Sequence, residues 1–265
     1  MRGVKELLDL SGRRAMVSGG AGHIALAAEE ALVELGARVA ILDRDEPACR
    51  ERVRQLERIR AGAAVSVPCD LLDERQTRGA AQSAAAELGG VDILIHCAFY
   101  SGTAPGDPGR LETRTVAEWD KAIRVNLTAA FVLVQEVRQE LAASGHGSVI
   151  LVSSTYGVSG PVMGLYAGTD MVNEPDYAAT KGGLIQLARY FATTLAPRVR
   201  VNVVSPGGVA RGQPEAFVRR YKERTPLQRM AVEEDLKGAF AFLAGDASAY
   251  VTGTNLLVDG GWTAW

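Results

Sequence analysis

The sequence predicts a doubly wound α/β fold of the Rossmann type, in which a seven-stranded parallel sheet carries helices on both faces. Short apolar runs rich in β-branched residues alternate with amphipathic stretches of helical period along the chain. Apolar strands separated by helices indicate a parallel sheet that is buried on both faces, and right-handed crossovers then give the doubly wound order. The expected strands are RAMVSG, ARVAILD, AAVSVPCD, VDILIHCA, GSVILVSS, VRVNVVSPGG and TNLLVDGG. The expected helices cover about 22–35, 45–61, 73–88, 118–143, 176–196, 214–224 and 232–244.

Length and composition favour one domain over residues 1–265. A chain of 265 residues can bury a substantial core, and no linker-like stretch divides it. The net charge of −2 provides no basic field for nucleic acid or an anionic membrane. No apolar run approaches the roughly 20 residues that span a bilayer, and the start MRGVKELLDLSG does not read as a signal peptide. We therefore expect a small-molecule substrate, and neither a nucleic acid nor a membrane as partner.

The cysteines indicate a reducing compartment. Cys49, Cys69 and Cys97 are odd in number and widely spaced, which favours free thiols in a cytoplasmic protein over a disulfide framework. The three histidines form no spaced cluster with them, so no metal site is expected.

The end of the first expected strand carries a glycine-rich turn, SGGAGHIALAAEEAL. Gly20, Gly22 and Ala25 fit the pattern G-x-G-x-x-[G/A], directly after a strand and at the start of a helix. Gly20 would permit the tight turn, Gly22 would let the backbone approach a pyrophosphate, and Ala25 would allow close packing of helix on strand. The pyrophosphate would lie at the positive end of the helix. The alternative is a strand–helix turn without a ligand.

Acidic residues end the next two expected strands. Asp43 follows the glycines by just over 20 residues, where a carboxylate can accept hydrogen bonds from an adenosine ribose and repel a 2′-phosphate, so NAD is preferred over NADP. Arg44 could bind that phosphate and limits the preference. Asp70 stands where it could meet an adenine amino group. For Asp43 and Asp70 alike, the alternative is that the carboxylate caps the following helix.

Together these residues resemble the short-chain dehydrogenase/reductase family, in its shorter single-domain branch. The resemblance runs from VSGGAGHIA to LLVDGG and includes DL at 70–71, VNL at 125–127, VSS at 152–154, YAATK at 177–181 and NVVSPGGV at 202–209. It implies a nicotinamide-dependent oxidoreductase whose catalytic residues are Ser154, Tyr177, Lys181 and Asn126. The expected cofactor-binding residues are Gly19, Gly20, Gly22, His23, Ile24, Asp43, Arg44, Asp70, Leu71, Cys97, Ala98, Tyr177, Lys181, Pro206, Gly207 and Val209.

The catalytic assignment also has a chemical argument. A phenol with a pKa near 10 is a poor base at neutral pH, and a neighbouring ammonium would lower that pKa. Lys181 stands four residues after Tyr177 on one helix face, and Ser154 at a strand end could polarise a substrate oxygen. Asn126 would hold a water in a proton relay to Lys181; the alternative is a core amide with satisfied hydrogen bonds.

Two other tyrosines follow the candidate serine. Neither Tyr156 nor Tyr166 has a lysine four residues later, so both are expected to line or support the substrate pocket.

Several segments depart from the family pattern. His23 and Ala25 replace two of the usual glycines, and HCAF at 96–99 stands where the family has N-N-A-G, which places Phe99 at a turn facing the cofactor. The segment between Ser154 and Tyr177 is long, and long ordered loops are usually functional. We expect it to form a wall of the substrate pocket or a subunit contact.

The C-terminal part suggests a lid and an assembly. Residues of about 208–228 correspond to the family's substrate lid, in which Arg211 could meet an anionic group of the substrate; the alternative for its arginines is a solvated helix face. Trp262 and Trp265 are expected to pack at a subunit interface or to close a neighbouring subunit's pocket in a homo-oligomer, either a tetramer or a dimer.

Two classes of function remain at this stage. The first is an NAD(P)-dependent oxidoreductase that interconverts a secondary alcohol and a ketone on a polar small molecule, sugar-like or acidic, with a 3-oxoacyl thioester as an alternative substrate. The second is a dinucleotide-binding protein without net redox turnover, either a regulatory module or an enzyme that uses NAD transiently for epimerisation or elimination. The intact Ser154, Tyr177 and Lys181 favour the first.

Overall fold

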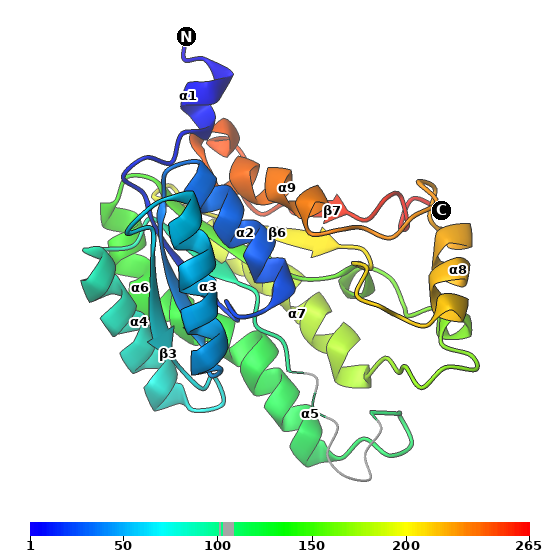
Figure 1. The fold of residues 1–265 in the computed structure, drawn as a ribbon. Helices are drawn as coiled ribbons and strands as arrows, with labels where there is room; N and C mark the ends of the chain where they lie inside the picture. The colour runs from blue at the N-terminus through cyan, green and yellow to red at the C-terminus, as the bar shows by residue number, and fades with distance from the viewer. Residues whose placement is uncertain (101, 103–108) are drawn as a thin grey trace.

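The computed structural model describes residues 1–100, 102 and 109–265, and it confirms the predicted sheet (Figure 1). Seven strands form one sheet in the order β3-β2-β1-β4-β5-β6-β7, and every neighbouring pair is parallel. The strand order reverses between β1 and β4, where an open α/β sheet offers a crevice for ligands. The strands are β1 Arg14–Ser18, β2 Arg38–Asp43, β3 Ala64–Pro68, β4 Ile93–His96, β5 Gly147–Val152, β6 Val199–Pro206 and β7 Asn255–Val258.

Helices connect the strands at the predicted places. The expected helix 118–143 is interrupted by a π-helical turn, η1 Arg124–Thr128, which divides it into α5 and α6. The α-helices are α1 Val4–Leu8, α2 His23–Glu34, α3 Glu46–Ile59, α4 Glu74–Leu88, α5 Val116–Ile123, α6 Ala129–Ala143, α7 Pro175–Thr194, α8 Glu215–Arg224 and α9 Glu234–Ala244. Short 3₁₀ turns are η2 Thr155–Gly157, η3 Met163–Leu165 and η4 Asp246–Ser248.

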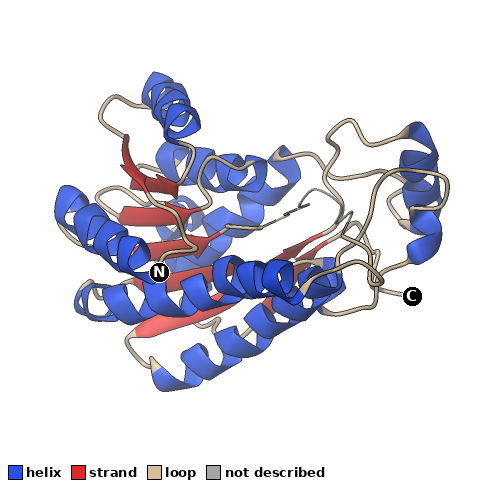
Figure 2. Cartoon of the chain, turned by 90° about the horizontal axis from the view of Figure 1, so that it is seen from below, coloured by secondary structure: helices blue, strands red, loops and turns tan. Residues whose placement is uncertain are grey.

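The sheet is the middle layer of three (Figure 2). One face is covered by α4, α6 and α7, whose apolar side chains form a single buried cluster with the strands. The other face is covered by α2, α3 and α9. Burial on both faces explains why the strands are apolar along their length. The carboxyl ends of the strands stay clear of these layers and hold the candidate site.

A third apolar cluster lies beyond the carboxyl ends of the strands, around α8 (Figure 1). It joins Leu165 of the long segment after β5, Phe217 and Tyr221 of α8, and Trp262 near the C-terminus. Trp262 is 3% exposed and stacks on Tyr221 with ring centroids 4.5 Å apart. The expectation that Trp262 packs at a subunit interface is therefore wrong, because its own chain buries it. Trp265 is exposed.

In the part of the chain that the structure describes, no helix combines the length and the apolarity required to cross a bilayer.

Candidate active site

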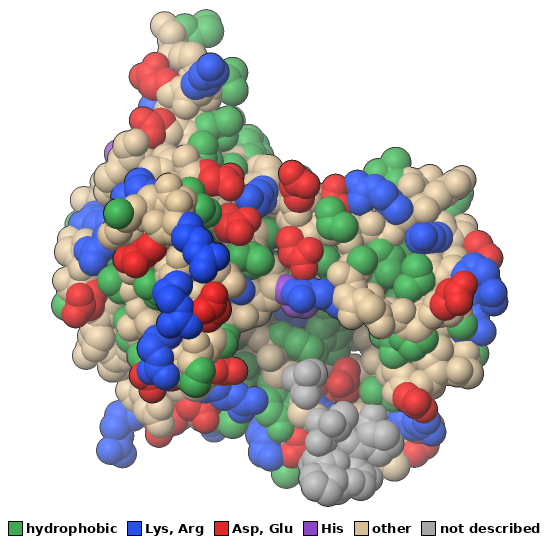
Figure 3. Space-filling model, viewed as in Figure 1, with side chains coloured by type: hydrophobic (Ala, Val, Ile, Leu, Met, Phe, Trp, Pro, Cys, Tyr) green, Lys and Arg blue, Asp and Glu red, His purple; other side chains and the backbone are tan. Residues whose placement is uncertain are grey.

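Two cavities open side by side at the carboxyl ends of the strands. The Asp43 cavity, of about 370 Å³, extends from Asp43 and Arg44 to Phe99, and the Tyr177 cavity, of about 380 Å³, contains Tyr177 and Lys181. Both are lined by Gly19, Asp43 and Phe99, so they are neighbours. Figure 3 shows this face of the molecule hollowed between the body of α2 and α3 and the part that carries α8.

The turn after β1 brings the backbone close to a neighbouring strand end. Gly19 has φ +69°, and a Cβ at this position would lie 2.4 Å from Cα of Ala98. Gly20 has no positive φ, but a Cβ there would lie 2.6 Å from Cγ2 of Ile41. We had predicted that Gly20 permits the tight turn, but the residue with the required positive φ is Gly19. Gly20 is needed for another reason, because the side chain of Ile41 packs against it.

Asp43 faces the glycine turn and does not cap a helix. Asp45 is the N-cap of α3 and accepts from the N–H of Ala48. The carboxylate of Asp43 accepts from the N–H of Ala21 at 3.2 Å and from that of Asp45 at 3.1 Å. Each carboxylate oxygen has two acceptor positions, which leaves capacity for hydroxyl donors in the cavity.

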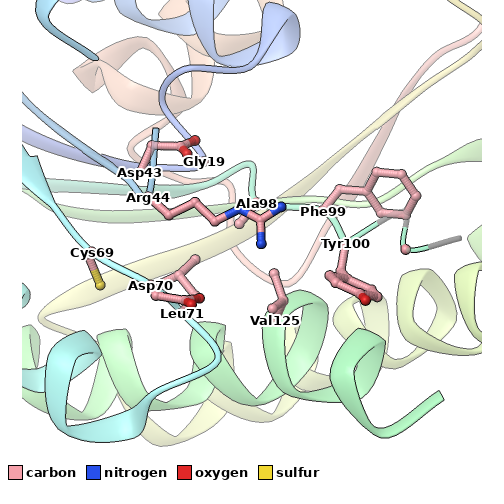
Figure 4. Close-up of a pocket in the computed structure, with 11 residues that line it drawn as sticks. Gly19, Asp43, Arg44, Cys69, Asp70, Leu71, Ala98, Phe99, Tyr100 and Val125 are labelled. Carbon is pink, nitrogen blue, oxygen red and sulfur yellow. The ribbon is translucent and has the colours of Figure 1, made fainter. Parts of the chain in front are cut away.

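Arg44 and Asp70 line the Asp43 cavity. In Figure 4 the Arg44 side chain extends across the cavity toward Ala98, while Asp70 lies on the opposite wall beside Leu71. Asp73, not Asp70, caps α4. The alternative role of Asp70 as a helix cap is thereby removed, and its carboxylate accepts instead from the N–H of Leu72 at 3.0 Å.

Tyr177 and Lys181 lie on one face of α7 and line the Tyr177 cavity. Lys181 is 3% exposed, and its Nζ donates to the carbonyl of Val152 at 2.8 Å. The same Nζ lies 5.7 Å from the centroid of the Tyr177 ring and 5.8 Å from that of Phe99. The lysine is thus held beneath the two rings by the end of β5.

The pKa values of this pair differ from those we predicted. Burial raises the pKa of Tyr177 above its usual value, and a hydrogen bond with Ser154 acts in the opposite direction. Burial also lowers the pKa of Lys181 to about 8. The expectation that Lys181 lowers the pKa of Tyr177 is wrong for this structure, because desolvation of the phenol is the dominant cause.

Ser154 and two further tyrosines adjoin Tyr177. Ser154 is buried, and its Oγ accepts from the N–H of Tyr156 at 3.2 Å. Tyr156 meets Tyr177 edge to face, with centroids 6.4 Å apart, and its hydroxyl accepts from that of Tyr166 at 3.2 Å. Tyr166 packs on Phe217. These contacts join the candidate acid/base residue to the cluster around α8, in agreement with a supporting role for both tyrosines.

Asn126 occupies the π-helical turn and is fully buried. Its Oδ1 accepts from the N–H of Tyr100 at 2.7 Å, and its Nδ2 donates to Oγ1 of Thr180 at 3.1 Å. Its carbonyl oxygen lies 3.1 Å from Nε2 of His96, and burial lowers the pKa of His96 to about 3. The side chain has the hydrogen bonds of a satisfied core amide, the alternative that the sequence left open.

Arg211 does not line any of the cavities described here. Its Nε pairs with a carboxylate oxygen of Glu233 at 3.0 Å. In the structure Arg211 is paired with Glu233 at the surface, and its contact with a substrate anion stays a prediction.

The structure brings most of the predicted site residues to the two cavities. The Asp43 cavity contains Gly19, Asp43, Arg44, Asp70, Leu71 and Ala98. The Tyr177 cavity contains Gly19, Gly22, His23, Ile24, Asp43, Cys97, Tyr177, Lys181, Gly207 and Val209. Gly20, Pro206, Ser154, Asn126 and Tyr156 do not line them, and Tyr166 lines a separate cavity of about 930 Å³ beside the segment after β5. Among the described residues, no three His, Cys, Asp or Glu side chains gather as metal ligands.

Two buried ion pairs next to the site were not predicted. Arg114 binds Asp176, the residue before Tyr177, through two nitrogens at 2.6 and 2.9 Å. Arg52 binds Glu29 at 2.6 Å beneath the glycine turn. The partners of these two pairs are 62 and 23 residues apart, so no periodic pattern in the sequence predicts that they meet. The sequence did offer one sign of a buried charge, which is Glu29 within the alanine-rich run ALAAEEAL.

Comparison with known proteins identifies the family. Residues 19–263 match the family model described as enoyl-(acyl carrier protein) reductase. The chain is 34% identical to cis-4-hydroxycyclohexanecarboxylate dehydrogenase of Sinomonas cyclohexanicum over 257 residues, 95% of this chain and 97% of that protein. It is 32% identical over 263 residues, 96% of both chains, to the probable galactose dehydrogenase of Rhizobium meliloti strain 1021.

A solved structure has the same architecture. The gluconate 5-dehydrogenase of Burkholderia cenocepacia J2315, crystallised with NADP and tartrate, superposes with a TM-score of 0.85 at 29% identity and covers 99% of this chain and 100% of its own. The matches extend over nearly the whole chain and agree with the observed sheet order and glycine turn. The chain is a member of the short-chain dehydrogenase/reductase family, and an enzyme that acts on CH–OH groups.

Proposed function

We propose that the protein interconverts a secondary alcohol and a ketone on a polar small molecule, with Tyr177 as the general acid/base. The observation that carries the proposal is that Tyr177 and Lys181 line the same cavity as Gly19 and Gly22 of the glycine turn. Two relatives are named for galactose and for a hydroxycyclohexane carboxylate, which supports a hydroxyl-bearing substrate, sugar-like or acidic, over a 3-oxoacyl thioester.

The residues of the two cavities fit a nicotinamide dinucleotide. Gly19 and Gly22 line the Tyr177 cavity, and so does His23 at the start of α2, which suits a pyrophosphate. Asp43 would hold the adenosine ribose, and on that ground we propose NAD as the preferred cofactor over NADP. Arg44 crosses the same cavity (Figure 4) and would bind a 2′-phosphate, so the preference is moderate.

The chemistry divides between the cofactor and the chain. A bound nicotinamide takes up or supplies the hydride. During ketone reduction, Tyr177 donates its phenolic proton to the oxygen of the former carbonyl as the C–H bond forms; during oxidation, the phenolate takes the hydroxyl proton. The hydroxyl of Ser154, which acts to lower the pKa of Tyr177, would polarise the substrate oxygen. Lys181 lines the same cavity and would donate to a ribose hydroxyl of the cofactor.

Residues after β5 and around α8 would form the substrate wall. We propose that residues 208–228 act as the lid and that residues 155–176 set substrate specificity, with the chain acting as one catalytic unit. Arg220 of α8 donates to the carbonyl of Leu165 at 3.2 Å, so the two segments are in contact. Replacing Tyr166 by Phe should change the KM for substrate and leave the KM for NAD unchanged; an unchanged substrate KM would remove the segment from the pocket.

We also propose that the protein is a homo-oligomer. The aromatic side chains of Phe131 on α6 and Tyr190 on α7 are exposed, and exposed aromatics on adjacent helices are typical of interfaces. Sedimentation should give a dimer or tetramer that Phe131→Lys with Tyr190→Lys dissociates. A monomeric wild type would overturn this proposal.

The direct test of function is a substrate panel. Polyols, sugars and hydroxy acids with NAD or NADP should produce an absorbance change at 340 nm. If the protein binds NADH tightly and converts a substrate without a net absorbance change, transient use of NAD is favoured. If it binds neither dinucleotide, the redox function is removed.

A further inference from the structure

The Arg52–Glu29 ion pair lies directly beneath the glycine turn. The side chains of Arg52, from α3, and Glu29, from α2, are buried, and Nη1 of Arg52 donates to the carboxylate at 2.6 Å. A buried ion pair is by itself weak evidence for stability, because desolvation can exceed the attraction. Its placement at this turn therefore calls for a functional explanation.

Arg52 also binds the backbone of the turn itself. Nη1 donates to the carbonyl of Gly20 at 3.0 Å, and Nη2 donates to those of Gly22 at 3.2 Å and Ala21 at 3.4 Å. One guanidinium thus collects three consecutive carbonyl groups from the turn that precedes α2. A planar fork with several donors can do this, whereas a lysine ammonium has no such geometry.

The direction of these carbonyls determines the direction of the turn's amides. A peptide group is planar, with C=O and N–H on opposite sides, so carbonyls drawn toward Arg52 turn the N–H groups of the following residues away from it. Of the three N–H groups that are set in this way, that of Ala21 donates to Asp43 and that of Gly22 donates to the carbonyl of Gly19. The third belongs to His23, the first residue of α2, where an N–H has no intrahelical acceptor, and His23 lines the Tyr177 cavity.

Glu29 holds the guanidinium in this position. Its Oε2 takes the hydrogen bond from Arg52, while Oε1 has no hydrogen-bond partner among the described residues and would lie 2.7 Å from a Cβ at Gly20. Burial acts to raise the pKa of Glu29, and the charge and hydrogen bond of Arg52 act against that shift. The turn, the glutamate and the arginine are therefore packed as one unit.

We propose that Arg52, held by Glu29, is a positioning residue that fixes the glycine turn and thereby orients the first amide of α2, that of His23, for the pyrophosphate of the dinucleotide. This inference rests on the proposed dinucleotide-binding function. It assigns a role to two residues outside the glycine motif, which touch neither cavity, and it accounts for a charged pair in an otherwise apolar helix layer.

Binding of NADH to the purified full chain tests the inference, by fluorescence titration. Arg52→Met should raise the Kd at least tenfold while kcat at saturating cofactor stays within about twofold, because the reacting groups on α7 are untouched. Arg54→Met on the same helix, whose partner Glu51 is exposed, should leave the Kd unchanged. Arg52→Lys should resemble Arg52→Met; restoration of wild-type affinity by lysine would reduce the role of Arg52 to charge alone and overturn the proposal.

A second measurement needs no cofactor, and it uses a variant chosen so that the protein still folds. The double variant Glu29→Ala with Arg52→Met leaves no unpaired buried charge. Amide hydrogen exchange in residues 19–24 should be faster in it than in wild type and in Arg54→Met, without cofactor present. Equal exchange, or equal Kd values in Arg52→Met and wild type, would overturn the inference. A wild type that binds no dinucleotide while exchange at the turn still rises in the double variant would overturn the proposed function and the phosphate role, but not the orienting contact.

Discussion

The ring of Phe99 stands edge to face on that of Tyr177, with the two centroids 5.0 Å apart and an interplanar angle of 83°. Phe99 lines both the Asp43 cavity and the Tyr177 cavity. It therefore lies on the path that a dinucleotide spanning the two cavities would take. The bulky residue at this position is a departure from the family pattern that the structure connects directly to the candidate acid/base residue.

Removing this ring should strengthen cofactor binding. An aromatic pair of this kind contributes about 0.5–1.5 kcal/mol beyond its buried area, and a ligand that displaces the ring has to overcome that contact. Phe99→Ala should therefore lower the Kd for NADH by about two- to tenfold, measured by fluorescence titration. Tyr250→Ala, which removes a fully exposed ring, is the control. Weaker binding in Phe99→Ala would show instead that the ring contacts the bound cofactor.

Asp43 and Arg44 should control the choice between the two dinucleotides. Asp43→Ala removes the acceptor for the ribose hydroxyls and the repulsion of a 2′-phosphate, so kcat/KM for NAD should fall by about 10- to 100-fold, the effect of a charge-assisted hydrogen bond. Arg44→Ala should lower kcat/KM for NADP more than for NAD. Steady-state kinetics with both cofactors measures the ratio, and an unchanged ratio in both variants would place selectivity elsewhere.

The Arg114–Asp176 pair should support the start of α7. Both side chains are at least 97% buried, and removing one partner of a buried pair costs about 3–5 kcal/mol. Asp176→Asn should lower the free energy of unfolding by about that amount and reduce kcat, because Tyr177 is the next residue. Denaturant unfolding measures the first effect. Asp235→Asn breaks a pair of the same two-pronged form with a half-exposed Arg229, and should cost less than about 1 kcal/mol.

Lys181 should lower the stability of the folded protein at neutral pH. Its pKa is reduced by burial from 10.5 to about 8, so the unfolded chain binds more protons between these values and stability rises with pH across that interval. Lys181→Met should therefore be more stable than wild type by about 2 kcal/mol at pH 7, after allowance for the lost bond to Val152. The difference should shrink as the pH rises from 8 to 10.5. Lys5→Met, at an exposed position, should show no such pH-dependent difference.

The sequence predicted the parts of the fold and site that depend on local patterns. The apolar strands and the 3.6-residue periods placed all seven strands and the principal helices, and the glycine turn and Asp43 came to the cavity as expected. Strand-end position was informative because parallel strands collect their carboxyl ends at one edge of the sheet.

What could not be predicted depends on contacts between distant segments. Trp262 looked like an exposed terminal aromatic until Tyr221 of α8 was found stacked on it, and Arg211 looked free until Glu233 was found beside it. The raised pKa of Tyr177 follows from burial. The four-residue spacing to Lys181 carries no information on how deeply the phenol is buried. A sequence motif identifies neighbours on one helix, but desolvation depends on everything packed around them.

The measurement that tests the central claim most directly is turnover and cofactor binding in Tyr177→Phe, on a substrate found with wild type. The phenylalanine keeps the ring contacts with Phe99 and Tyr156 and removes only the hydroxyl that exchanges the proton. Turnover in both directions should fall at least a thousandfold, in the range of a lost general acid/base, while the Kd for NADH stays within about threefold of wild type. In wild type, oxidation should rise and reduction should decline only as the pH is taken above 10, because burial raises the pKa of Tyr177 above its usual value of 10.0. Turnover in Tyr177→Phe that retains the wild-type rate and pH profile would contradict the assignment of Tyr177 as the acid/base.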